Sequence, residues 1–168
     1  MENNWIVKIA NHNDLDRWFK FVTNVTHDFY DIDLVNNANF RNVIIKNINR
    51  KTAIYVEHNG KIIGGMTYSP NSNHISWIAV DPRYRRRGIG SKLVKHMFKE
   101  LSDRKELTVK TFIEGEWQSD VSHPFYRSLG FESTNEISYD DLENNANKPM
   151  LKFKKIINNS GNERPNST

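Results

Sequence analysis

The chain has 168 residues, 37% of them hydrophobic and 26% charged, which is typical of one globular domain. It has a net charge of +4 and no cysteine, which excludes disulfides, a thiol nucleophile and the usual cysteine-rich zinc sites. No signal-peptide pattern is present and no apolar run approaches the roughly 18 residues of a membrane span, so we expect a cytoplasmic protein without a membrane partner.

The first third of the chain predicts a strand and a helix, followed by two less definite stretches. Trp5 to Ile9 reads as a strand, and Asn13-Asp14 offers a cap for a helix whose apolar residues recur at helical spacing. The acidic and aromatic stretch from Thr26 to Asn37 fits either a loop or a short helix. Arg41 to Ile48 is ambiguous between helix and strand.

The middle of the chain predicts three strands. Thr52 to Glu57 and Ile62 to Tyr68 flank Asn59-Gly60, a tight hairpin signal. His74 to Val80 is the third strand, and its apolar residues change phase along it. Either both faces of this strand are buried, or a bulge shifts its register between Trp77 and Ile78.

The last half predicts two helices and three strands. An amphipathic helix runs from Gly90 to Leu101, and Leu107 to Ile113 follows as a strand. Ser122 is expected to cap a short helix that has Pro124 in its first turn and ends at Gly130. The remaining elements are strands at Phe131 to Tyr139 and Met150 to Ile157. We therefore expect one domain over residues 1–157 and a disordered tail over residues 158–168.

A basic turn with two glycines joins the third of the middle strands to the long helix. A helix N-terminus offers unpaired N–H groups and positive dipole charge, and Gly88 and Gly90 let an anion approach these groups closely. Residues 83–99 contain seven Lys or Arg and no acid, whereas residues 128–147 contain five acids and no Lys or Arg. This segregation favours an anionic ligand near the turn, although two solvated faces explain it as well. The turn by itself predicts a pyrophosphate site.

Two motifs resemble the GNAT superfamily of N-acetyltransferases. The family signature Arg/Gln-x-x-Gly-x-Gly/Ala is matched by Arg85, Gly88 and Gly90, after a strand that ends in Ile78-Ala79-Val80. A second family element, Phe-Tyr-x-x-x-Gly-Phe, is matched by residues 125–131. The resemblance implies an α/β (α+β) fold: one mixed, mostly antiparallel sheet of six or seven strands, splayed between the fourth and fifth, with about four flanking helices.

The same resemblance implies acetyl-CoA as co-substrate, held without a metal. Its pantetheine arm would pair with the backbone of Ile78, Ala79 and Val80. Its pyrophosphate would rest on the turn and the start of the helix. The residues expected there are Arg85, Arg86, Arg87, Gly88, Ile89, Gly90, Ser91 and Lys92. The family often has an Asn near the start of the next helix, and counting back from Tyr126 puts Ser119 at that place.

In the family an amine attacks the thioester directly, so the resemblance assigns Tyr126 as the general acid that protonates the leaving thiolate. The alternative role for Tyr126 is structural: its ring would pack the helix on the sheet. The backbone N–H of Val80 would stabilise the oxyanion. For the general base the sequence leaves Glu114, His74 and an ordered water open.

The acceptor is expected to be a primary amine of a small molecule or a peptide. The two stretches that would border its cleft contain acids and no Lys or Arg before Lys148, which favours a cationic acceptor, although solvated loops explain this equally well. These acids are Asp28, Asp31 and Asp33 in the first stretch and Asp140, Asp141 and Glu143 in the second. Family members are frequently dimers, so a homodimer is compatible with the sequence.

Three other classes compete with an acetyltransferase. An acyl-CoA-binding sensor or partner-binding domain would keep the fold without turnover. A nucleic-acid binder is suggested by the pI of about 9.2 and Arg85-Arg86-Arg87, but the basic helix lacks interleaved aromatic residues. A nucleotide hydrolase or dehydrogenase is excluded because the chain has no P-loop, and Leu93 stands where a dinucleotide fingerprint has its third glycine.

Overall fold

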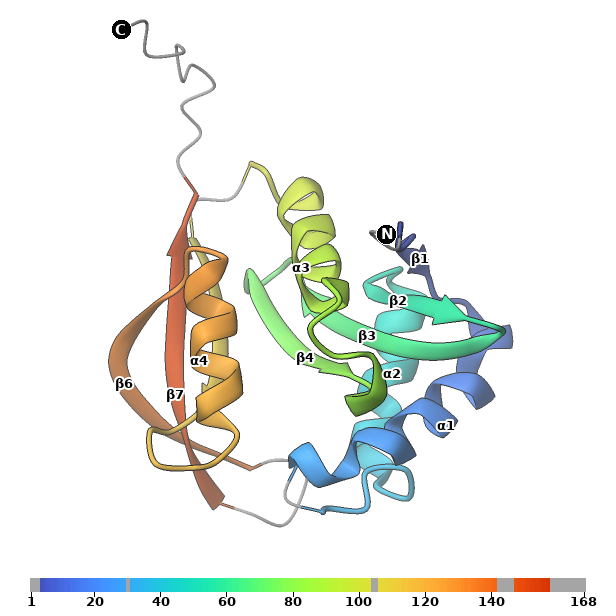
Figure 1. Cartoon of the computed structure of the whole chain (residues 1–168), viewed down its shortest axis with the longest axis horizontal. Coiled ribbons are helices and arrows are strands. Elements are labelled where there is room, and N and C mark those ends of the chain that lie inside the picture. Colours follow the sequence, from blue (N-terminus) through green and yellow to red (C-terminus); the bar gives the residue numbers. More distant parts are fainter. Residues whose placement is uncertain (1–3, 30, 104–105, 142–146, 158–168) are drawn as a thin grey trace, which may run out of the picture.

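A computed structural model describes residues 4–29, 31–103, 106–141 and 147–157. In these ranges the chain forms a seven-stranded sheet with four α-helices and three short 3-10 helices (Figure 1). The strands are β1 (Lys8–Ile9), β2 (Ala53–His58), β3 (Lys61–Ser69), β4 (His74–Val80), β5 (Glu106–Phe112), β6 (Glu132–Asp141) and β7 (Asn147–Ile156). The helices are α1 (Leu15–Val25), α2 (Ala38–Asn49), α3 (Ile89–Glu100) and α4 (Ser119–Ser128), with η1 (His12–Asp14), η2 (Thr26–Phe29) and η3 (Pro82–Tyr84). The predicted tail, residues 158–168, lies outside the described ranges.

The sheet has the order β1-β2-β3-β4-β5-β7-β6, and only β4 and β5 are parallel neighbours. All other neighbouring pairs are antiparallel. The predicted mixed, mostly antiparallel sheet is therefore confirmed. The hairpin between β2 and β3 is also confirmed, because Asn59 and Gly60 both have positive φ, as a two-residue type I′ turn requires.

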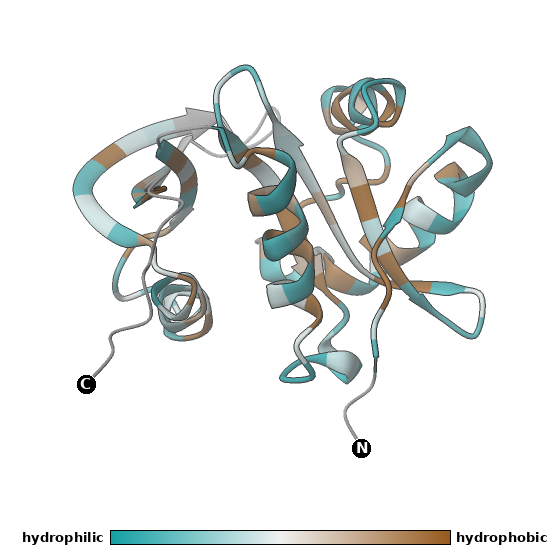
Figure 2. Ribbon diagram, turned by 90° about the horizontal axis from the view of Figure 1, so that it is seen from above, coloured by the Kyte–Doolittle hydropathy of each residue, from teal (hydrophilic) through white to brown (hydrophobic). Residues whose placement is uncertain are grey.

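Helices cover both faces of the sheet, and each face has its own hydrophobic core. On one face α1 and α2 pack against β2 and β4 through a cluster that includes Trp18, Phe40 and Trp77. On the other face α3 and α4 pack against the sheet through a cluster that includes Leu93 and Tyr126. Figure 2 shows hydrophobic and hydrophilic residues alternating around the helices, as expected of helices with one buried side.

Two adjacent glycines in β3 let helices from opposite faces approach the sheet closely. A Cβ at Gly64 would lie 2.5 Å from Ile89 of α3, and a Cβ at Gly65 would lie 2.9 Å from Trp18 of α1. Successive residues of a strand point to opposite faces, so the pair provides one close contact on each side. This packing places the start of α3 directly over the middle of the sheet.

The phase change predicted in β4 is real: both faces of the strand are buried and a bulge is present, but the bulge does not lie between Trp77 and Ile78 as predicted. Ile75 belongs to the core under α3, whereas Trp77 and Ala79 belong to the core under α1 and α2. Thr67 pairs with Trp77 and Tyr68 pairs with Ile75, so the extra residue of the bulge is Ser76. The bulge therefore precedes Trp77 instead of following it. It lets Ile75 and Trp77 face opposite cores.

Three other elements differ from their predicted bounds. Residues 41–48, left ambiguous by the sequence, lie within α2, and the first strand contains only Lys8–Ile9. The prediction that Ser122 caps α4 is wrong: the helix begins at Ser119, and Pro124 lies inside it. Before Pro124, the N–H groups of Val121 and Ser122 both bond to the carbonyl of Gln118, which starts the helix one turn earlier.

Candidate active site

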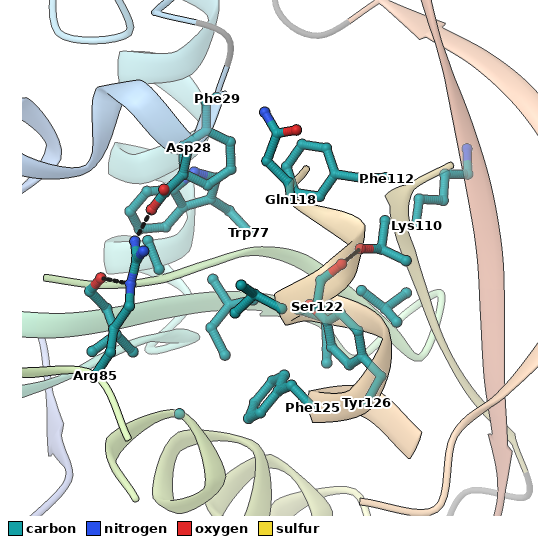
Figure 3. A pocket seen from close by; sticks show the side chains of 18 of the residues that line it. Asp28, Phe29, Trp77, Arg85, Lys110, Phe112, Gln118, Ser122, Phe125 and Tyr126 are labelled. Carbon is teal, nitrogen blue, oxygen red and sulfur yellow. Dashed lines mark hydrogen bonds and ion pairs between the residues drawn. The ribbon is translucent and has the colours of Figure 1, made fainter. Parts of the chain in front are cut away.

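The two halves of the sheet diverge between β4 and β5 (Figure 1). These strands pair only at His74 with Thr108 and at Ile75 with Val109. Beyond this point a cavity of about 770 Å³ opens between them. Residues of η2, β4, the first turn of α3, β5 and α4 line it, and Figure 3 shows 18 of these side chains. The fold therefore places the predicted splay and the basic turn on one cavity.

One end of the cavity is the N-terminus of α3. Gly88 is the N-cap residue with φ +82°, and no side chain caps the helix there. Arg86 also has a positive φ, so the turn directs successive backbone N–H groups outward, as an anion-binding nest does. A Cβ at Gly88 would meet no atom within 4 Å, which leaves that face of the turn open. Unpaired N–H groups and the helix dipole suit this end for a phosphate.

One edge of β4 forms a wall of the same cavity. The N–H of Asp81 bonds to the carbonyl of Ile63 at 2.8 Å, on the β3 side. Backbone groups alternate between the two edges of a strand, so those of Ala79 also face β3. Those of Ile78 and Val80 face the cavity, and the carbonyl of Val80 accepts a hydrogen bond there from Arg85 Nε at 3.2 Å. An extended polar chain can pair with this edge as an additional strand.

The opposite wall is α4, with Tyr126 and Ser122 toward the cavity (Figure 3). Tyr126 is 5% exposed, and its ring packs edge-on against Phe131 with 5.7 Å between ring centroids. Burial raises the pKa of the Tyr126 hydroxyl above its ordinary value. The hydroxyl therefore stays protonated at neutral pH and is available as a hydrogen-bond and proton donor. The hydroxyl of Ser122 lies 2.9 Å from that of Thr111.

The other end of the cavity has aromatic walls. Phe29 of η2 stacks on Trp77 of β4, with ring centroids 5.5 Å apart. His27 stacks on Trp117, which precedes α4, at 5.1 Å. Segments from the two halves of the sheet thus meet at this end. Gln118, which is buried, also lines the cavity here.

A charged pair lies in the same wall as these aromatic residues. Arg85 forms an ion pair with Asp28 of η2, and only 18% of the Asp28 side chain is exposed. The sequence predicted Arg85 as a phosphate ligand, but its guanidinium group lies between Val80 and Asp28. The partnership could not be read from the sequence, because the two residues are 57 positions apart.

The candidate bases differ in their access to the cavity. Glu114 is exposed and does not line it. His74 lines it, but at the narrow end where β4 meets β5, and its Nδ1 lies 2.7 Å from the hydroxyl of Thr108. Asp81, at the exit of β4, is 1% exposed and caps η3 by accepting a bond from the N–H of Arg83. Among the described residues, the acids that line the cavity are Asp28 and Asp120.

Most of the predicted cofactor residues line this cavity, and three do not. Those that line it are Ile78, Ala79, Val80, Arg85, Arg86, Gly88, Ile89, Gly90 and Ser91, together with Tyr126. Arg87 is not among the lining residues: its guanidinium lies 5.2 Å from the ring centroid of Tyr84, and its carbonyl accepts a bond from Trp5 Nε1 at 2.9 Å. Lys92 is exposed on α3. The hydroxyl of Ser119 donates to the carbonyl of Glu116 at 2.7 Å, and Ser122, one turn later, faces the cavity instead.

The acids that favoured a cationic acceptor are only partly in the cavity. Asp28 lines it, whereas Asp31 and Asp33 are exposed and lie outside its wall. The side chains of Asp140, Asp141 and Glu143 lie outside what the structure describes. None of the helices in the described ranges combines the length and apolar character needed to cross a membrane.

Comparisons with known proteins agree with this architecture. A solved acetyltransferase of the GNAT family from Bacillus cereus ATCC 10987 is similar, with TM-score 0.67, 24% identity and coverage of 92% of this chain and 98% of that one. A ribosomal-protein-alanine N-acetyltransferase from Brucella melitensis gives TM-score 0.68 and 19% identity over 90% of this chain and 99% of that one. The PaiA N-acetyltransferase from Thermoplasma acidophilum, solved in complex with coenzyme A, gives TM-score 0.67 and 13% identity over 92% of this chain and 99% of that one.

These likenesses establish the fold. No curated protein sequence matches the chain. The sequence model of the acetyltransferase (GNAT) domain matches residues 50–133, half of the chain, and this range contains β2 to α4 and thus the turn and Tyr126. The chain therefore belongs to the GNAT acetyltransferase family.

Proposed function

We propose that this protein is an N-acetyltransferase that transfers an acetyl group from acetyl-CoA to a primary amine of a small molecule or peptide. The observation that carries the proposal is one continuous cavity that joins an uncapped helix N-terminus, the unpaired edge of β4 and the buried hydroxyl-bearing ring of Tyr126. A thioester on a long polar arm with a diphosphate at its far end matches these three features in order.

The diphosphate is assigned to the turn before α3. The N–H groups from Arg86 to Gly90 supply hydrogen bonds, and Arg86 and Ser91 lie beside them in the cavity wall. The pantetheine arm is assigned to the edge of β4, where the backbone groups of Ile78 and Val80 face the cavity. The family resemblance assigns Ile78, Ala79 and Val80 to the pantetheine arm. The strand geometry supports Ile78 and Val80 alone, because the backbone groups of Ala79 face β3.

The reaction assigned to the site is direct attack of the amine on the thioester carbon. The tetrahedral intermediate carries an oxyanion, and we assign its stabilisation to the N–H of Val80, which faces the cavity. As the C–S bond breaks, Tyr126 donates its proton to the departing sulfur. The aromatic side chains at the other end of the cavity give the amine an apolar surface next to the thioester.

The acceptor is assigned to the end formed by Phe29, Trp77 and Trp117. These walls suit an amine on an apolar or aromatic group. Asp28 is the described acid that can meet a positive charge there, so one ammonium group fits better than several. A panel of neutral, acidic and polybasic amines checks this assignment, and a preference for acidic acceptors contradicts it.

Release of free thiol from acetyl-CoA in the presence of this amine panel tests the proposed activity. We expect amine-dependent release by the wild-type protein and a product whose mass exceeds that of the amine by one acetyl group. Tyr126→Phe should retain coenzyme A binding and lose most of the release. Binding of coenzyme A without thiol release across the whole panel would instead indicate an acyl-CoA sensor.

A further inference from the structure

Asp28 lies in the cavity wall that faces Tyr126. Figure 3 shows Asp28 and Arg85 on one side of the cavity and Ser122 and Tyr126 on the other. The space between the two walls is where an amine and a thioester must meet in the proposed reaction. A carboxylate on one side and a hydroxyl on the other give the cavity an acid and a base at opposite walls.

Arg85 ties this carboxylate to the end of β4. Its guanidinium group donates through Nη2 to Asp28 Oδ2 and through Nε to the carbonyl of Val80 at 3.2 Å. Val80 is also the residue whose N–H is proposed to receive the oxyanion. Because a carboxylate has two oxygens and about four lone-pair sites, the bond to Arg85 leaves Asp28 able to accept from an ammonium group.

The other ionisable groups in the wall are less suited to receive a proton. Asp120 is exposed in the first turn of α4, so water competes with an amine for its carboxylate. His74 lies at the narrow end, engaged with Thr108. Lys110, Arg85 and Arg86 are cationic and cannot accept a proton in their charged forms. Among the described residues of the wall, Asp28 is the remaining carboxylate, and only 18% of its side chain is exposed.

We propose that Asp28 receives the ammonium group of the acceptor and removes its proton, with Arg85 as the positioning residue. This inference rests on the proposed acetyltransferase function and assigns the base that the family resemblance left open. It also defines the acceptor as a primary ammonium ion whose substituent packs against Phe29 and Trp77.

One N–H bond of the ammonium ion breaks and its proton passes to Asp28, which leaves a lone pair on nitrogen. This nitrogen bonds to the thioester carbon, the C–S bond breaks with its electrons on sulfur, and Tyr126 protonates the thiolate. A second proton leaves the nitrogen and restores Tyr126 through solvent. The proton on Asp28 also passes to solvent, so the products are an amide, the thiol and one proton.

The electrostatics of the wall support this role. Burial raises the pKa of the Asp28 carboxyl above its ordinary value, although the neighbouring Arg85 and His27 act in the opposite direction. A carboxylate with a raised pKa is a stronger base than a solvated one. The stacked rings of Phe29 and Trp77, with centroids 5.5 Å apart, form an apolar surface in the same wall.

The test compares Asp28→Asn, Asp28→Glu and Asp33→Asn in the full chain, with thiol release measured from pH 6 to pH 10. Asp33 is exposed and lies outside the cavity wall, so Asp33→Asn is the matched control. We expect Asp28→Asn to lower kcat/KM for the amine by about 10²-fold or more, with the KM for acetyl-CoA within about threefold of wild type. The deficit should shrink as the pH approaches the pKa of the amine, because solvent then supplies the neutral nucleophile. Asp28→Glu should recover part of the rate, and Asp33→Asn should match wild type.

Melting temperatures establish that each variant is folded. If Asp28→Asn keeps the wild-type rate and pH dependence, or loses acetyl-CoA binding in proportion to turnover, Asp28 is not the base. An unstable Asp28→Asn leaves the decision to Asp28→Glu, whose rate should then still depend on pH with a shifted acidic limb. A wild-type protein that releases no thiol with any amine contradicts the proposed function itself, a result distinct from failure of the Asp28 variants.

Discussion

The ring of Phe125 lies directly over Gly90, so that a Cβ at residue 90 would be 3.0 Å from both Cε2 and Cζ of the ring. Gly90 is in the first turn of α3 and Phe125 is in α4, so the contact joins the helices on the two sides of the cavity. The second glycine of the turn therefore serves packing as well as approach of an anion. Any side chain added here displaces the ring at the phosphate end of the cavity.

Gly90→Val should weaken coenzyme A binding by at least about tenfold, because the two valine methyl groups force Phe125 into the cavity and cover the N–H groups of the turn. Calorimetry with coenzyme A measures the change. Lys95→Val, on the exposed side of the same helix, is the matched control because it carries the same cost of a β-branched residue in a helix. Equal affinities for the two variants would show that the contact with Phe125 does not shape the site.

Tyr126→Phe should lower kcat by about 10² to 10⁴-fold and leave the affinity for coenzyme A unchanged. The ring keeps its packing against Phe131, so the melting temperature should change little. Because burial raises the pKa of Tyr126, the neutral donor persists at high pH. Wild-type activity should therefore not fall near pH 10, where an ordinary tyrosine ionises. If the kcat of the wild-type protein falls near pH 10 and that of Tyr126→Phe does not, the hydroxyl is not buried during turnover.

The two serines of α4 should separate a structural role from a binding role. Ser119→Ala removes the bond to the carbonyl of Glu116 and should cost about 0.5–2 kcal/mol of stability, because that bond closes the turn before the helix. Ser122→Ala should weaken coenzyme A binding a few-fold, because its hydroxyl lines the cavity beside Thr111. If Ser119→Ala alone loses coenzyme A binding, Ser119 is the cofactor-binding serine, as the sequence predicted.

Asp81→Ala should destabilise the protein by about 1–2 kcal/mol, measured by urea unfolding at pH 7. Its carboxylate caps η3 and accepts a bond from the Arg83 guanidinium at 2.8 Å, and this bond holds the pKa of Asp81 below its ordinary value. A lowered folded-state pKa means that the contribution is complete above about pH 4 and is lost as the pH falls through the folded value. The deficit of Asp81→Ala should therefore shrink below pH 4, and a deficit that grows there would contradict the assignment.

Much of the fold could be predicted because local patterns and long-range packing agree. Asn59-Gly60 specifies its hairpin, and the apolar spacing from residue 89 to residue 101 specifies a helix that keeps this spacing in the structure. The phase change in β4 also correctly indicated a bulge. Its position could not be read from the sequence, because it depends on which of two cores receives Ile75 and which receives Trp77.

The candidate site was only partly predictable for a similar reason. The turn from Arg86 to Gly90 is local, so its motif identifies it. The position of the Arg85 side chain depends on its ion pair with Asp28. Asp28 comes near Arg85 only because α1 and η2 pack against the sheet. The start of α4 depends on backbone bonds to the carbonyl of Gln118. Because of this start, the serine that faces the cavity is Ser122, one turn after the predicted Ser119. Sequence therefore identified the residues of the turn before α3 better than those at the aromatic end of the cavity.

Titration of the protein with coenzyme A and with pantetheine by calorimetry, at low and at raised salt, tests the central claim most directly. We expect saturable binding of one coenzyme A per chain that weakens as salt is added, and much weaker binding of pantetheine, which lacks the phosphates. Absence of coenzyme A binding at low salt, or equal affinity for the two ligands, would contradict the assignment of the α3 N-terminus as a diphosphate site.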